Sequence, residues 1–300
     1  MPSILRKTLV LAAALVIPAC GGKVVVDGFG AAQGASGVGG SGGATSSVTS
    51  SVTTGEGAGG AGGDPIEYDA GPDGYYPPPL AAVYANSSDS LYVINPATNA
   101  VSLVGAFQGC DFVIDIAVNR TGGVFATTKS ALFAVDPTTA VCKYIANGTY
   151  PNSLSFVPQG TVNPDHETLV GYTGSSYVRI DPNTGLVSPV GDLGDPSLAS
   201  SGDLFSLIGG GTYLTVKSEK CSDCLIEVNP ATGKLLKQLG PIGDYSNVWG
   251  LAFWGGTAYG FTNNGRMFSL DPATMKTAPI FYNGGQVAFW GAGSSTAAPM

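Results

Sequence analysis

Histidine, basic residues and long apolar runs are scarce in this 300-residue chain, and each shortage excludes a class of function. A single histidine, His166, cannot build a histidine-based metal centre, and any Ser-His-Asp arrangement would depend on it. With 13 Lys and Arg against 21 Asp and Glu there is no basic patch for phosphates, so we expect no nucleic-acid partner. We expect His166 to be a solvated loop residue, and we expect no catalytic residue, metal or cofactor.

The first apolar stretch lies at the N-terminus, where Arg6 and Lys7 precede it and Ile17-Pro18-Ala19-Cys20 ends it. It is too short to cross a bilayer of roughly 30 Å, so the pattern predicts a signal peptide over residues 1–19. The last four residues resemble the lipobox of bacterial lipoproteins. That resemblance implies that Cys20 is lipidated and becomes the N-terminus of a membrane-anchored chain. The alternative is ordinary secretion with cleavage before the cysteine.

Residues 20–79 differ sharply in composition from the rest of the chain. They are mostly Gly, Ser, Thr and Ala and become acidic and Pro-rich toward residue 79. Such a segment buries too little apolar area to fold, so we expect a disordered tether after the lipidated cysteine. Gly21 beside Cys20 resembles lipoproteins sorted to the outer membrane. We therefore expect an exported protein on the outer membrane or cell surface of a Gram-negative bacterium, and no second membrane span.

The most informative feature that is present is a repeated phrase: a strand, an Asx-Pro-x-Thr turn and another strand. The turns begin at Asn95, Asp136, Asp181, Asn229 and Asp271, so the intervals are 41, 45, 48 and 42 residues. Repeats of that length are typical of propeller blades or solenoid units. In each turn the Asp or Asn accepts backbone N–H groups and the proline presets φ, so we interpret these residues as structural.

Each repeat divides into four strands, and residues 80–300 predict an all-β, five-bladed β-propeller. The last blade shows the division best, with strands expected at 248–253, 257–262, 266–270 and 276–281. The domain starts at a second strand, and residues 286–291 (QVAFWG) repeat the first-strand phrase GLAFWG at 250–255. We therefore expect residues 286–291 to complete blade one and close the ring, which removes open sheet edges.

Residues 83–107 resemble the repeats of YVTN-type bacterial surface propellers, a group near the NHL and quinoprotein-like propellers. The similarity covers the five repeats, about two-thirds of the chain. It implies a propeller but not a function, because those relatives include surface-layer proteins, binding scaffolds and enzymes. YVTN propellers usually have seven blades, so this chain departs from them in blade number. The order of lipobox, tether and propeller also resembles uncharacterised lipoproteins of predatory soil bacteria.

Four cysteines follow Cys20, and an even number in an exported protein predicts disulfides. Cys221 and Cys224 lie at an expected hairpin tip, where a short-loop disulfide, a redox pair or a zinc site are the alternatives. We favour the disulfide, because a β-hairpin offers nothing that lowers a thiol pKa. Cys110 and Cys142 are then left to pair with each other, although the first and last strands of a blade are not neighbours.

Two further groups of residues could form a site. Asp115, Asp203 and Lys217 are candidates for a polar site at the end of the channel. Asp192, Asp195 and Asp203 could offer oxygens to Ca²⁺, but they are better interpreted as acidic turn residues. The aromatic residues near the closure could pack between blades or stack on a ligand; they are Trp249, Trp254, Trp290, Tyr245, Tyr259 and Phe289. Trp254 and Trp290 occupy equivalent places in the two phrases, which favours packing.

Two functions fit these features. The first is a monomeric, non-catalytic lipoprotein that is tethered to the membrane and binds a protein or glycan through one face of the ring. The second is an extracytoplasmic propeller enzyme of lactonase or quinoprotein dehydrogenase type. The enzyme requires several acids with a metal in the channel, or a platform for a cofactor. Neither is assembled in the sequence, so we favour the binding protein.

Overall fold

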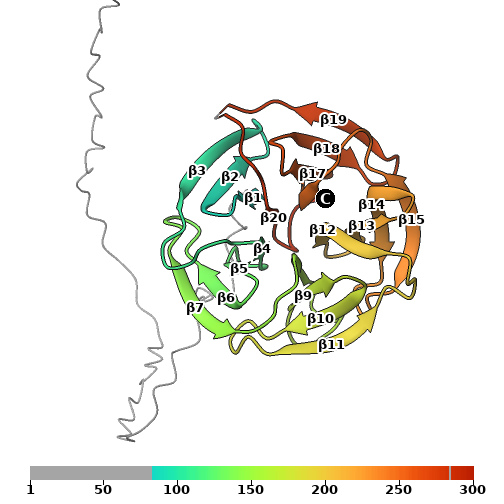
Figure 1. Cartoon of the computed structure of the whole chain (residues 1–300), viewed down its shortest axis with the longest axis horizontal. Helices are drawn as coiled ribbons and strands as arrows, with labels where there is room; N and C mark the ends of the chain where they lie inside the picture. The colour runs from blue at the N-terminus through green and yellow to red at the C-terminus, as the bar shows by residue number, and fades with distance from the viewer. Residues whose placement is uncertain (1–82, 284) are drawn as a thin grey trace, which may run out of the picture. The chain divides into compact units, whose positions relative to one another are not determined.

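The computed structural model describes residues 83–283 and 285–300, which form five antiparallel four-stranded sheets arranged as a β-propeller (Figure 1). The predicted fold and blade number are confirmed. The predicted signal peptide, lipidated Cys20 and tether lie outside the described residues. No helix in the described part of the chain is long and apolar enough to cross a membrane.

The strands run outward from the axis in each blade. Blade one contains β20 (Gly291–Gly293), β1 (Val83–Asn86), β2 (Ser90–Asn95) and β3 (Ala100–Ala106). Blade two contains β4 (Asp115–Val118), β5 (Val124–Thr127), β6 (Ala131–Val135) and β7 (Cys142–Asn147). Blade three contains β8 (Ser153–Val157), β9 (Thr168–Thr173), β10 (Ser176–Ile180) and β11 (Val187–Asp192). Blade four contains β12 (Ala199–Ser206), β13 (Thr212–Ser218), β14 (Cys221–Val228) and β15 (Leu235–Pro241). Blade five contains β16 (Val248–Trp254), β17 (Thr257–Thr262), β18 (Met267–Asp271) and β19 (Lys276–Ile280).

The closing strand lies later in the chain than its sequence predicts. The expected strand 286–291 overlaps β20 only at Gly291, and the residues before it form no strand. β20 pairs antiparallel with β1, with Gly291 opposite Asn86, so the C-terminal segment does complete blade one. The prediction that the C-terminal segment closes the ring is confirmed, but the residues predicted for the closing strand are wrong. The phrase repeated from blade five reflects local composition, whereas the register is set by contacts at the ring axis.

Apolar packing between neighbouring blades holds the ring together. The buried side chains form five clusters, and each cluster joins two adjacent blades. The innermost strands, such as β4 and β8, are buried along their whole length, whereas the outermost strands alternate between half-buried and exposed. Burial therefore falls from the axis to the rim, as expected when each sheet covers the next.

The five repeated turns have the structure that the sequence predicts. The Asn95 and Asp271 side chains each accept the N–H group two residues later, at 2.9 Å in both turns. The fifth residue of every turn has a left-handed φ between 56° and 72°, although two of these residues are Ala140 and Met275 rather than Gly or Asn. A left-handed alanine costs about 1–2 kcal/mol, which the capping bonds of the turn offset.

Both disulfide pairings are confirmed. Cys221 and Cys224 are bonded within β14, with their Cα atoms 5.9 Å apart. Cys110 is bonded to Cys142, with a Cα–Cα distance of 5.8 Å. This second pair is close because the connection from blade one runs beside the start of β7, where the Cys142 N–H donates to the Gln108 carbonyl at 2.8 Å.

Candidate functional site

One residue of each innermost strand is followed by an N–H group that donates to an aspartate at the axis, and we call these five places the channel positions. They are occupied by Asp115, Ser153, Asp203, Gly250 and Gly291. Their equivalence follows from their hydrogen bonding, because the N–H group of the next residue in all five blades points to an aspartate at the axis. Two carboxyl groups therefore serve five blades.

Asp115 joins blades two and three. Its Oδ1 accepts the N–H group of Ile116 at 2.8 Å, and its Oδ2 accepts that of Leu154 at 2.7 Å. The Asp115 side chain is fully buried. Because a buried N–H group without an acceptor is costly, this carboxyl group satisfies two donors that the narrow axis would otherwise leave unpaired.

Asp203 joins the other three blades. Its Oδ1 accepts the N–H group of Leu204 at 2.6 Å, and its Oδ2 accepts those of Leu251 at 2.8 Å and Ala292 at 3.3 Å. Ala292 belongs to the closing strand β20, so Asp203 ties the end of the chain to the centre of the ring. Its side chain is also fully buried.

The two buried carboxyl groups lie close enough that each shifts the pKa of the other, and their burial favours a pair that keeps one proton. Burial raises the pKa of both groups well above the ordinary value, and the backbone N–H donors act against that rise. The negative charge of Asp203 adds to burial in raising the pKa of Asp115. Asp203 also accepts three N–H groups, compared with two for Asp115. We therefore place the shared proton on Asp115 and the negative charge on Asp203.

This arrangement suits a structural seal better than a metal centre. Both oxygens of each carboxyl group already accept N–H donors, whose partial positive charges disfavour a cation. The acids that meet at the axis are the two carboxyl groups of Asp115 and Asp203. Within residues 83–283 and 285–300, no three His, Cys, Asp or Glu side chains are grouped in a way that could hold a metal ion. Asp192 and Asp195 lie apart from Asp203 and cap local turns.

Lys217 does not join the two aspartates. It is exposed near the end of β13 and lines a surface hollow with Asp223 and Trp249. The predicted channel site therefore divides into a buried acid pair and a separate lysine. No sequence pattern indicated Asp223 as the neighbour of Lys217, because Asp223 lies between the two cysteines of a hairpin and looked like a turn residue.

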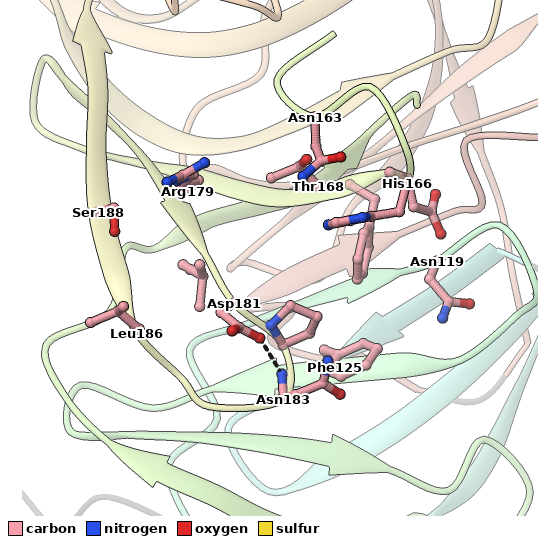
Figure 2. Close-up of a pocket in the computed structure, with 14 residues that line it drawn as sticks. Asn119, Phe125, Asn163, His166, Thr168, Arg179, Asp181, Asn183, Leu186 and Ser188 are labelled. Atoms are coloured by element: carbon pink, nitrogen blue, oxygen red, sulfur yellow. Dashed lines mark hydrogen bonds between the residues drawn. The ribbon is translucent and has the colours of Figure 1, made fainter. Parts of the chain in front are cut away.

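A second hollow of about 570 Å³ lies between blades two and three (Figure 2). It is lined by Phe125, Phe156, Leu186, Asn119, Asn163, Asn183, His166, Thr168, Arg179, Asp181 and Ser188, among others. His166 is exposed on the loop between β8 and β9, in the predicted type of position. Thr168 is buried, and its hydroxyl has no hydrogen-bond partner.

Ser188, His166 and Asp181 all line this second hollow, but they do not form a catalytic triad. Figure 2 shows Ser188 and His166 on different sides of it, and no hydrogen bond among the described residues links His166 to either partner. The Asp181 carboxylate instead accepts the N–H groups of Asn183 at 2.8 Å and Thr184 at 3.3 Å. A triad needs a base within hydrogen-bonding reach of its nucleophile, so this hollow offers a place to bind and not an assembled nucleophile.

The aromatic residues near the closure have two roles. Tyr259 and Phe289 belong to the buried cluster between blades five and one, and Trp254 packs beside them. Tyr245 is buried and stacks on Phe268, with a centroid distance of 3.8 Å. These four residues pack between blades, which confirms the favoured interpretation for them.

Trp249 and Trp290 are half-buried, and their rings meet edge to face with centroids 5.7 Å apart. Each of them directly precedes a channel glycine, Gly250 or Gly291. Trp290 is therefore equivalent to Trp249, and the expected equivalence of Trp290 and Trp254 is wrong.

No protein-family model matches the chain, and no curated protein sequence matches it. Solved structures are similar in fold. A nidogen/laminin complex aligns with a TM-score of 0.46 and 11% identity, over 72% of this chain and 81% of that one. A Bacteroides caccae protein of unknown function aligns with a TM-score of 0.40 and 12% identity, over 69% and 76% of the two chains. BamB from Moraxella catarrhalis aligns with a TM-score of 0.34 and 13% identity, over 65% of this chain and 58% of that one. These values carry no information about function, and the resemblance to YVTN and NHL propellers stays a prediction.

Proposed function

We propose that this protein is a lipid-anchored, non-catalytic propeller that binds a protein or glycan of the cell envelope or its surroundings. The lipid on Cys20 holds the chain at the membrane, and residues 20–79 let the ring reach its partner. The propeller presents its surface hollows for binding and uses its axis for stability. The proposal includes a monomeric ring on the outer membrane or cell surface.

The observation that carries this proposal is the state of the acid pair. An enzyme that works in the channel needs acids whose oxygens are available to a metal, water or substrate. Asp115 and Asp203 are fully buried, and their oxygens accept N–H groups from all five blades. The polar and aromatic groups that remain accessible line the surface hollows instead.

A propeller enzyme of lactonase or quinoprotein dehydrogenase type is the alternative. It would have to act in a surface hollow, and the one that contains His166 is the best placed. Its unpaired Thr168 hydroxyl and its mixture of amides with apolar side chains suit recognition. The triad geometry that would favour hydrolysis is missing among the side chains described there.

The test uses the mature chain with Cys20→Ala, which keeps it soluble. Co-sedimentation with outer-membrane, peptidoglycan and capsular-polysaccharide fractions measures binding. Hydrolysis of lactones with added Ca²⁺, and dye-linked oxidation of alcohols and sugars with added pyrroloquinoline quinone, measure catalysis. We expect saturable binding to at least one fraction and no turnover above the blank. Turnover that is lost in His166→Ala but kept in the matched surface variant Asp192→Asn would overturn the proposal in favour of an enzyme.

A further inference from the structure

A shallow hollow of about 650 Å³ lies beside Trp249, and we call it the Trp249 hollow. It is lined by Ser197, Ala199, Ser201, Lys217, Ser218, Ser222, Asp223, Asn247 and Trp249. These residues come from the start of β12, the end of β13, the start of β14 and the start of β16, together with the connections beside them. Because adjacent strands are antiparallel, all these strand ends lie on one face of the propeller. The hollow shown in Figure 2 is built from the opposite strand ends.

The Trp249 ring forms a rigid wall of this hollow. It is half-buried and contacts Trp290 edge to face, with ring centroids 5.7 Å apart. The preceding residue, Val248, is fully buried and anchors the strand. At Gly202 a side chain would collide with the Val248 carbonyl, so the glycine lets β12 approach β16. This approach brings Ser201 to the same hollow as the Trp249 indole. The part of the indole that lines the hollow can accept a flat apolar surface.

Polar groups gather on the other side of the hollow. The Asp223 side chain is 5% exposed, and its Oδ2 accepts the Asn247 N–H group at 2.7 Å. The Ser201 hydroxyl is buried beside that carboxylate, where it lowers the pKa of Asp223. The Lys217 ammonium is exposed and near enough to lower the pKa of Asp223, which burial raises. The hollow thus offers a carboxylate, a hydroxyl and an ammonium group opposite an indole face.

The Cys221–Cys224 disulfide fixes the position of Asp223. Ser222 and Asp223 are the two residues between the bonded cysteines, so the disulfide restricts the backbone that carries the carboxylate. The Asn247 N–H group holds the side chain from the neighbouring blade. Asp223 is therefore positioned before any ligand arrives, which is the condition for efficient recognition by a polar group.

The chemistry of these groups selects a neutral ligand. The Asp223 carboxylate disfavours an anion, as does the net charge of −8 on the chain. The Lys217 ammonium, on the same hollow, disfavours a quaternary ammonium or other cation that an aromatic wall might otherwise attract. A sugar residue satisfies all the groups, because its C–H face stacks on indole while adjacent hydroxyls donate to a carboxylate and accept from an ammonium.

We infer that the Trp249 hollow binds a neutral sugar residue of a glycan, stacked on Trp249 and hydrogen-bonded to Asp223, Ser201 and Lys217. This inference rests on the proposed function and specifies the partner as a carbohydrate. It also gives the half-buried tryptophan, the buried Ser201 hydroxyl and the disulfide-bound aspartate a common use.

The experiment titrates the Cys20→Ala chain with neutral oligosaccharides, namely maltotriose, cellotriose, mannotriose and triacetylchitotriose. Calorimetry and saturation-transfer NMR measure binding, with glucuronate and choline as charged probes. We expect at least one neutral probe to bind and neither charged probe to do so. Trp249→Ala should weaken binding about tenfold or more, and Lys217→Gln a few-fold, because stacking supplies most of the affinity. Trp249→Phe should restore part of the loss.

Two matched controls separate a local effect from misfolding. Trp254→Phe alters a tryptophan that packs between blades, and Lys237→Gln alters an exposed lysine on the outer strand β15. Both should bind sugar as the parent does, and thermal melting should show that every variant is folded. Sugar binding that Trp249→Ala leaves unchanged would overturn this inference. So would a chain that binds an envelope fraction but none of the sugars, and in that case the proposed function would stand without it.

Discussion

The unequal roles of the two channel aspartates lead to a quantitative prediction about stability. Asp203→Asn should destabilise the ring far more than Asp115→Asn. The amide introduced by Asp203→Asn keeps one acceptor oxygen for three N–H groups, so at least one buried donor loses its partner and the remaining bonds lose a charged acceptor. Bonds to a charged group and an orphaned buried donor are worth about 1–3 kcal/mol each, so we expect a loss of about 3–5 kcal/mol. At about 2–4 °C per kcal/mol for a domain of this size, Tm should fall by roughly 6–20 °C.

Asp115→Asn should be milder because the amide imitates the protonated acid. Its NH₂ group can donate to the neighbouring Asp203 carboxylate. It loses one acceptor for the N–H groups of Ile116 and Leu154, which costs about 1–2 kcal/mol. The surface variant Asp192→Asn, which keeps an acceptor for the Gly194 N–H group, is the control and should cost less than about 1 kcal/mol.

The proton on Asp115 also gives a dependence on pH. An aspartate in the unfolded chain releases its proton near pH 3.9, whereas burial raises the folded pKa of Asp115 well above that value. Between those two values the folded state binds more protons than the unfolded state, so this group's contribution to stability falls as pH rises. The slope is at most about 1.4 kcal/mol per pH unit for one proton. Asp115→Asn removes that slope, so its stability deficit relative to the parent should shrink between pH 5 and pH 7.

Thermal and urea unfolding at pH 5, 6 and 7 measures the stability of the parent and the three variants. Glu167 and Asp223, whose pKa values are also raised by burial, are common to parent and variants and cancel in the differences. Asp203 is coupled to Asp115 and its pKa is raised too, so the pH dependence that Asp115→Asn removes belongs to the pair. Equal losses for Asp115→Asn and Asp203→Asn would refute the placement of the proton. A deficit that does not change with pH would refute the raised pKa of Asp115. Losses below about 1 kcal/mol for both would show that the N–H groups at the axis do not need these acceptors.

Three further predictions concern the ends of the chain and its cysteines. Cys20→Ala should move the full-length protein from the detergent phase to the aqueous phase in a Triton X-114 partition, and equal partitioning of parent and variant would exclude lipidation. Truncation after Tyr282 removes the fully buried Phe289 and the strand β20, so unfolding should require much less urea. Loss of the phenylalanine alone costs about 3–5 kcal/mol. A truncated chain whose Tm lies within a degree or two of that of the parent would contradict this prediction. Thiol titration of the denatured, unreduced Cys20→Ala chain should find no free sulfhydryl, and mass mapping should join Cys221 to Cys224 and Cys110 to Cys142; any crossed pair would contradict the structure.

The parts of the fold that the sequence predicts well depend on local chemistry. An Asx-Pro-x-Thr turn needs only its own residues to form, so five turns could be counted and the blades numbered before any contact was known. Strand order within a blade follows from hairpins, and the place of Val83–Asn86 as a second strand is confirmed. The Cys221–Cys224 bond is likewise a contact between residues three apart.

The acid pair could be predicted only in part, because its partners lie in other blades. Asp115 and Asp203 stood out as candidates, but their acceptor role depends on the N–H groups of Leu154, Leu251 and Ala292, which are 39, 48 and 89 residues away in sequence. Backbone donors are invisible in a sequence, since every residue except proline has one. The same holds for Asp223 and Trp249, which come together only because β14 and β16 both start on the same face of the propeller.

The error in the closing strand has one physical cause, and it also explains the mistaken equivalence of the tryptophans. QVAFWG and GLAFWG are similar in composition, but the register of a closing strand is decided by which residue fits at the axis. At Gly291 a side chain would collide with the Asp115 carboxyl group and crowd the Asn86 amide oxygen. Only a glycine fits where that carboxyl group fills the axis, so the glycine after Trp290 takes the channel position. Trp290 then lies beside Trp249 on the same face of the propeller. A carboxyl group that seals the channel thus also determines which tryptophans remain available at the surface.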